Sequence, residues 1–145
     1  MAQILQTYSS MLFRSLGYTC VLTLWALIFA MVIGLIFALC NVSHCKPLNI
    51  LGSIYVDAIR GVPLIVLAYF IYFGVPQAFR FAGINNFRLP ALQAGTIALA
   101  LNCGAYMAEI FRAGIESIDK GQMEAGRSLG LTYGTTMRTV VLPQA

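Results

Sequence analysis

Three side chains that could do chemistry lie in or just after one apolar stretch of the sequence: Gln93, Asn102 and Glu109. Asn102, Tyr106 and Glu109 are spaced four and three residues apart, so on a helix they would share one face. If this stretch lies in a membrane, such polar groups are costly there and often line the path of a polar solute. Side-chain amides also form hydrogen bonds between neighbouring helices. The sequence leaves these two interpretations equally open.

Residue types that carry catalysis or metal binding are sparse. His44 is the only histidine, so it has no histidine partner for a metal site, and we interpret it as a solvated loop residue. The four cysteines form no C-x-x-C pair, and those in apolar runs should behave as small hydrophobic side chains. The scattered acids supply no nucleophile with an adjacent base. We therefore expect no catalytic residue, no metal site and no enzymatic activity in this chain.

The composition indicates that membrane-spanning helices position the polar side chains. Of the 145 residues, 59% are hydrophobic and 10% are charged, whereas about 25% of the residues in a soluble domain are charged. Three runs contain no charged residue: Ser15–Ser43, Gly61–Phe79 and Leu89–Ala108. Each run approaches or exceeds the roughly 20 apolar residues that a transmembrane helix needs. We predict an all-α membrane protein with three transmembrane helices, over residues 16–40, 61–79 and 89–109.

Particular residues in these spans should set where the helices start and how they pack. Pro63 fits the first turn of the second span, where a missing N–H costs nothing, and Gly61 precedes it. Arg60 would extend toward the membrane interface. Small residues such as Ala30 and Gly34 in the first span allow another helix to approach closely.

The basic residues predict an orientation, because short loops rich in lysine and arginine stay in the cytoplasm. With three spans, the N-terminus and the loop over 80–88 share one side, and the loop over 41–60 and the segment over 110–145 share the other. The first side holds three basic residues, which are Arg14, Arg80 and Arg88. The second holds six, which are Lys46, Arg60, Arg112, Lys120, Arg127 and Arg138. We predict that the N-terminus lies outside and that residues 110–145 lie in the cytoplasm. No basic run interleaved with aromatic residues favours a nucleic-acid partner.

The segment over 110–145 has the pattern of two short helices. We expect Gly121 to end a helix that extends the third span. Short helices over 122–129 and 133–142 would follow, with Gly130 between them in the left-handed conformation typical of a helix C-cap. Thr132 would cap the second helix.

The first of these short helices could present a surface to a partner. Ala125 and Gly126 have almost no side chain, so a partner could approach closely, and Glu124 adds a charge. Alternatively, the helices lie on the membrane surface with Arg127 and Arg138 toward lipid phosphates.

These residues form a pattern that resembles a known family. The stretch reads Glu124-Ala-Gly-x-x-x-Gly130-x9-Val140-x-Leu142-Pro143 and resembles the EAA loop of binding-protein-dependent ABC importer permeases. Gly126 stands where that family usually has alanine, and Val140 where it usually has isoleucine. Two flanking stretches resemble the polar amino-acid branch. They are Asp57-Ala-Ile-Arg-Gly-Val-Pro-Leu64 with Ile71-Tyr-Phe-Gly-Val-Pro76, and Ala105-Tyr-Met-Ala-Glu-Ile-Phe-Arg112 with Gly121-Gln-Met-Glu-Ala125.

The resemblance implies a type I importer permease subunit in a bacterial cytoplasmic membrane. Such a subunit would pair with a second permease subunit, two cytoplasmic ATPase subunits and an extracytoplasmic amino-acid-binding protein, with membrane lipid around it. The EAA loop would couple the permease to the ATPase through Gly121, Glu124, Ala125, Gly126, Gly130, Leu142 and Pro143. The chain contains no G-x-x-x-x-G-K-[ST] motif, so ATP and Mg²⁺ would be bound by the partner ATPase and this chain needs no cofactor of its own.

Permeases of this branch usually continue with two further spans after the Leu-Pro-Gln-Ala sequence at the end of this chain. We therefore expect the chain to be the N-terminal part of such a permease domain. The alternative that remains is a small oligomeric channel without ATPase coupling, in which Asn102 and Gln93 line the pore.

Overall fold

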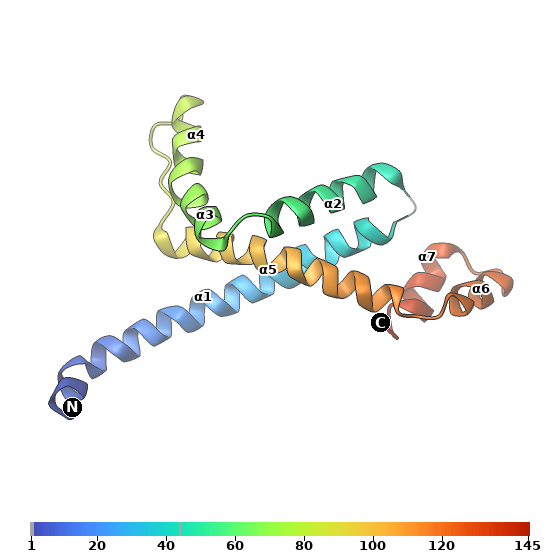
Figure 1. Ribbon diagram of the computed structural model, residues 1–145, viewed down its shortest axis with the longest axis horizontal. Coiled ribbons are helices and arrows are strands. Elements are labelled where there is room, and N and C mark those ends of the chain that lie inside the picture. Colours follow the sequence, from blue (N-terminus) through green and yellow to red (C-terminus); the bar gives the residue numbers. More distant parts are fainter. Residues whose placement is uncertain (1, 44) are drawn as a thin grey trace. The chain divides into compact units, whose positions relative to one another are not determined.

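A computed structural model describes residues 2–43 and 45–145, with side chains from Tyr8 onward, and these residues contain helices and no strand. His44 lies outside the described residues. Figure 1 shows the elements in chain order. They are α1 (Ala2–Val42), α2 (Lys46–Arg60), α3 (Leu64–Tyr69), α4 (Val75–Phe81), α5 (Ala91–Glu116), α6 (Lys120–Ser128) and α7 (Tyr133–Thr136), with π-helical turns η1 (Phe70–Gly74) and η2 (Met137–Val141).

Three helical stretches are long and apolar enough to cross a membrane, which confirms the predicted fold class. They are Tyr8–Val42, Leu64–Phe81 and Ala91–Glu116, with mean hydropathies of 2.7, 1.5 and 1.3. The third extends seven residues beyond the predicted end at residue 109. Its added turns contain Arg112, which forms ion pairs with Glu109 at 2.8 Å and with Glu116 at 2.6 Å. Because these charges pair along one side of the helix, the helix continues past the apolar run.

The chain forms two compact units, and α1 and α5 each run through both. The first unit comprises Met1–Ala30 with Val62–Cys103, and the second comprises Met31–Gly61 with Gly104–Ala145. The boundary after Gly61 coincides with the end of α2 at Arg60. Pro63 then caps α3 with an extended backbone (ψ 137°), as expected for a residue that begins a new helix.

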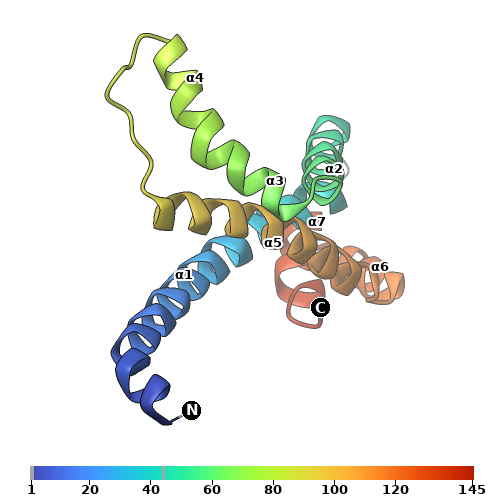
Figure 2. The same cartoon turned by 60° about the vertical axis from the view of Figure 1, so that its left-hand side comes forward.

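Small side chains make up most of the buried core of the first unit. Ala26, Ala30, Ala94 and Ala98 are each at most 2% exposed. From α3 through η1 to α4 the chain runs as one continuous helical rod (Figure 2). These alanines are buried where helices pack, as the sequence predicts, since small residues let membrane helices approach closely.

In the second unit α1 and α5 also pack closely. A Cβ atom added to Gly34 would lie 2.7 Å from the Cβ of Met107, and one added to Gly104 would lie 3.0 Å from Ile33 Cγ2. Phe37 of α1 stacks on Tyr55 of α2, with ring centroids 3.9 Å apart. Burial raises the pKa of Tyr55 to about 12, so its hydroxyl stays neutral at physiological pH. The predicted close approach at Gly34 is confirmed.

The structure corrects the sequence prediction for residues 41–60, which were expected to form a loop. Lys46–Arg60 form the helix α2, with Pro47 in its first turn. Polar residues follow one another at helical spacing and form one stripe: Lys46, Asn49, Ser53 and Asp57. Gly52 and Val56 are the buried residues of α2. This spacing is the signal from which the helix could have been predicted.

Gly34→Ala should destabilise the protein, because the added methyl group would collide with Met107 on α5. We expect a loss of about 1–3 kcal/mol, the usual cost of overpacking, seen as a lower midpoint of thermal unfolding in detergent. Gly17→Ala is the matched control on the same helix, since nothing lies within 4 Å of its added Cβ. It should leave the midpoint unchanged or raise it, because alanine favours the helix by about 0.5–1 kcal/mol. A Gly34→Ala protein as stable as the Gly17→Ala protein would contradict the close approach.

Candidate functional site

The helix pair α6–α7 follows directly after the third candidate span (Figure 1). The start of α6 differs from the prediction. Asp119 caps this helix, and its Oδ1 accepts a hydrogen bond from the Gly121 N–H at 2.6 Å. Gly121 therefore lies in the first turn of α6, and α5 has already ended at Glu116. The prediction that Gly121 ends the helix of the third span is wrong, because the carboxylate of Asp119 starts a new helix before it.

The turn between α6 and α7 forms as predicted. Gly130 has a φ of +84°, in the left-handed region that favours glycine. The N–H of Leu131 donates to the carbonyl of Gly126 at 3.2 Å, and the N–H of Gly130 donates to the carbonyl of Arg127 at 3.0 Å. These two bonds form a Schellman motif. Thr132 caps α7, because its Oγ1 accepts a hydrogen bond from the Thr135 N–H at 3.3 Å.

Gly126 and Thr136 hold the two short helices together. Both residues are buried, and Thr136 is 0% exposed. A Cβ added to Gly126 would come within 2.9 Å of Thr136 Oγ1 and even nearer to Thr136 Cγ2. The hydroxyl of Thr136 donates to the carbonyl of Thr132 at 3.0 Å, so its side chain is held in place. The expectation that a partner approaches Gly126 is therefore corrected: Gly126 faces α7 and shapes the pair from inside.

The exposed side of α6 carries a small, a charged and an apolar side chain. Glu124 and Ala125 are exposed, as the sequence predicts. Leu129, at the end of the helix, is 82% exposed. Ala125 and Leu129 are four residues apart and so lie on one face of the helix. The sequence signal for such an exposed apolar side chain is its position directly before Gly130 in a polar segment.

The end of the chain folds back into a helical turn. The N–H of Leu142 donates to the carbonyl of Met137 at 2.8 Å, which closes the π-helical turn η2. The helix ends at Val141, one residue before the predicted end, and Pro143 is exposed in the following turn. Leu142 is half-buried.

A second polar cluster lies within the second unit, between α2 and α5. The guanidinium of Arg60 lies 3.9 Å from Glu109 Oε2, and its Cζ lies 5.3 Å from the ring centroid of Tyr106. Glu109 also pairs with Arg112. Arg60 therefore reaches α5 through both a charge and an aromatic ring, and it ties the end of α2 to that helix.

The polar stripe of α2 faces the same carboxylates. Asn49, Ser53 and Asp57 line a cavity of about 300 Å³ together with Glu109 and Glu116. The second unit thus contains a small polar cavity whose two walls belong to α2 and α5.

The three predicted path residues fall in different units. Gln93 and Asn102 belong to the first unit, and Glu109 belongs to the second. Gln93 is exposed and lines a cavity of about 430 Å³ with Trp25 and Phe29. Asn102 is half-buried. Within the described residues neither side-chain amide forms a hydrogen bond, so the interhelical bonding that the sequence left open is not seen for them.

In the part of the chain that the structure describes, no group of three or more histidine, cysteine, aspartate or glutamate side chains could hold a metal ion. The cysteines at positions 20, 40, 45 and 103 are free thiols. Two polar features of the second unit are the helix pair α6–α7 and the charged cluster of Arg60, Glu109, Arg112 and Glu116.

Three apolar helical spans followed by a pair of short polar helices are the architecture of a multi-pass membrane protein. Residues 30–145 match the family described as "Binding-protein-dependent transport system inner membrane component". The chain belongs to this family of inner-membrane transport components.

Individual relatives are similar over most of the chain. The L-cystine transport system permease protein TcyB of Bacillus subtilis (strain 168) is 42% identical over 140 residues, which are 97% of this chain and 57% of that protein. The arginine transport system permease protein ArtQ of the same organism is 36% identical over 132 residues, 91% of this chain and 58% of that protein. A solved structure described as "Crystal structure of an amino acid ABC transporter with histidines" is 39% identical, with a TM-score of 0.71 over 94% of this chain and 64% of that chain. The chain thus spans about three-fifths of the length of the curated relatives it matches.

Gly126→Ala should loosen the α6–α7 pair, because its methyl group would overlap the side chain of Thr136. We expect a loss of about 1–3 kcal/mol, measured as faster amide hydrogen exchange within α6. Thr136→Ala removes the atoms with which the new methyl group collides. The double variant Gly126→Ala/Thr136→Ala should therefore lose less stability than the two single variants together, by about 0.5–3 kcal/mol. Gly134→Ala is the control, since nothing lies within 4 Å of its added Cβ. Additive effects of the two substitutions would show that Gly126 and Thr136 do not pack together.

Proposed function

We propose that this chain is the transmembrane permease part of an ABC importer that carries a polar or charged amino acid across the bacterial cytoplasmic membrane. Membership of the binding-protein-dependent transport family supports the transport role. The names of its relatives, which refer to L-cystine, arginine and an amino acid, support the substrate class. The observation that carries the proposal is the ordered α6–α7 pair, which presents Glu124, Ala125 and Leu129 outside the candidate spans.

In this proposal the helix pair α6–α7 docks onto a separate ATPase subunit. The small side chain of Ala125 lets the partner approach, and the exposed Leu129 gives it an apolar contact, while Glu124 adds a charge. Gly121, Gly126, Gly130, Leu142 and Pro143 shape the pair. ATP and its Mg²⁺ are bound and used by the partner, which moves the docked helices as the two ATPase subunits close. Such rigid-body movement would switch the spans between inward-open and outward-open states.

The assembly would contain a second permease subunit, two ATPase subunits and an extracytoplasmic amino-acid-binding protein. Docking of α6–α7 to an ATPase requires that they lie in the cytoplasm, with the N-terminus outside. The excess of basic residues on that side of the chain agrees with this orientation.

Gln93, Asn102 and Glu109 are the proposed polar residues of the substrate path. For Gln93 the support is structural, because its amide is exposed beside a cavity and forms no hydrogen bond within the described residues. An amide that is not used for packing is available to a polar solute. Glu109 differs, because its carboxylate is already paired with Arg112 and lies near Arg60.

Ala125→Arg in the complete permease should abolish copurification of the ATPase and ATP-dependent uptake, because a long charged side chain would stand on the proposed contact face. Ala125 is exposed, so the variant should reach the membrane in normal amounts. We prefer this position to Gly126, where arginine would break the packing with Thr136. The measurement is a pull-down from solubilised membranes with a tagged permease, together with uptake into vesicles.

Ala82→Arg is the matched control, since Ala82 is also exposed but follows α4 in the first unit. It should keep both the ATPase and the uptake. If the Ala125→Arg protein still binds the ATPase and transports normally, the docking surface is wrong. Passive conductance without any bound ATPase, even in the complete permease, would favour the channel alternative.

Gln93→Ala should weaken uptake without changing stability, since its exposed amide makes no hydrogen bond within the described residues. Losing one hydrogen bond to the substrate would raise the KM for uptake about two- to tenfold. Val66→Ala, at an exposed position of α3 that does not line this cavity, serves as the control and should leave the KM unchanged. A normal KM in the Gln93→Ala protein would remove this residue from the path.

A further inference from the structure

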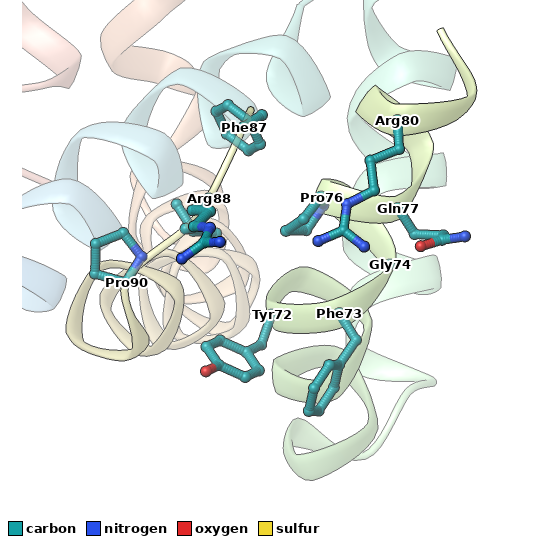
Figure 3. A pocket seen from close by; sticks show the side chains of 10 residues that line it. Tyr72, Phe73, Gly74, Pro76, Gln77, Arg80, Phe87, Arg88 and Pro90 are labelled. Atoms are coloured by element: carbon teal, nitrogen blue, oxygen red, sulfur yellow. The ribbon is translucent and has the colours of Figure 1, made fainter. Parts of the chain in front are cut away.

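We propose that a cavity at the end of α4 binds the phosphate group of an anionic phospholipid. The cavity has a volume of about 770 Å³ and lies entirely within the first unit. Residues from η1 and α4 form one wall, and residues just before α5 form the other (Figure 3).

Two arginines define the charge of this cavity. Arg80 lies in the last turn of α4, and Arg88 lies just before α5 begins at Ala91. Figure 3 shows the guanidinium of Arg80 directed across the cavity toward that of Arg88. Within the described residues neither guanidinium forms an ion pair.

The sequence offers these arginines no partner in their own unit. All five acidic residues of the protein lie in the second unit: Asp57, Glu109, Glu116, Asp119 and Glu124. Two like charges that face one cavity without a counter-charge repel each other and attract an anion. Arginine binds phosphate oxygens through two parallel N–H bonds, so a phosphate between Arg80 and Arg88 would satisfy both.

The local backbone holds the two walls in place. Gly83 has a φ of +89°. The N–H of Ile84 donates to the carbonyl of Phe79 at 2.9 Å, and the N–H of Gly83 donates to that of Arg80 at 3.0 Å. This Schellman motif ends α4 and turns the chain back. Phe87 then stacks on Phe79, with ring centroids 4.3 Å apart, which brings the following Arg88 beside α4.

The position and the lining favour a lipid over a dissolved anion. Arg80 lies near the end of one candidate membrane span and Arg88 lies shortly before the next, at the level where headgroups are expected. The opposite part of the cavity is lined by Tyr72 and Phe73, two residues of the apolar span that are 37% and 59% exposed. The cavity is therefore cationic at one end and aromatic at the other, which matches a phosphate attached to an acyl chain. A free phosphate would leave the aromatic end unused.

The test uses the intact chain in detergent, with phosphatidylglycerol as the probe and native mass spectrometry to measure the lipid retained. Each basic residue near an anionic lipid is worth about fivefold in binding, so the double variant Arg80→Gln/Arg88→Gln should retain phosphatidylglycerol about thirtyfold less well. Arg80→Lys/Arg88→Lys keeps both charges and should retain most of the lipid. It also separates loss of charge from loss of folding.

Lys46→Gln/Lys120→Gln is the matched control, because it removes two positive charges outside the cavity. It should bind phosphatidylglycerol like the unmodified chain. Phosphatidylcholine should compete poorly, since its ammonium group would meet the two arginines. Equal retention in the Arg80→Gln/Arg88→Gln protein, or equal competition by phosphatidylcholine, would overturn the proposal. Binding of inorganic phosphate without retention of phosphatidylglycerol would also overturn the proposal. The ligand of the cavity would then be a dissolved anion and not a lipid.

Discussion

In the hydrocarbon core of a membrane, every backbone N–H and C=O group must be paired within the protein, and this constraint governs the structure. It explains why the described residues form helices and no strand. It also explains where the chain turns. Breaks between helices, among them those at Gly61–Pro63, at Gly83, at residues 117–119 and at Gly130, fall outside the three stretches that qualify as membrane spans.

The same constraint limits how the spans attract one another. Lipid tails are as apolar as the side chains, so helices associate through close packing and not through the hydrophobic effect. This accounts for the alanines and glycines that form most of the buried core. Arg60 shows how a polar side chain can be accommodated between helices, because it extends from α2 and lies against Tyr106 and Glu109 of α5.

Charge is divided between the two units. The first unit contains arginines and no acid, whereas the second contains all five acids. In the second unit Glu109 and Glu116 pair with Arg112, and Asp119 caps a helix. The first unit therefore has charge available for an anion from outside it. The second unit uses much of its charge to hold its helices, and Glu124 is exposed.

The sequence by itself determined the helical membrane fold, the three spans and the turn of α6–α7, because each depends on local properties. The length of each apolar run determines where a membrane span can form, and only glycine readily adopts the φ of +84° at Gly130. The sequence also contains a local signal for α2, the polar stripe at helical spacing, although the count of basic residues treats residues 41–60 as a loop. Tertiary structure alone decided the role of Gly126: a small residue can face a partner or pack inside, and the side chain of Thr136 shows that it packs inside. It alone placed Phe87 on Phe79, and so brought Arg88 to the cavity of Arg80. Such pairings join residues on different elements, and no local pattern of residues contains them.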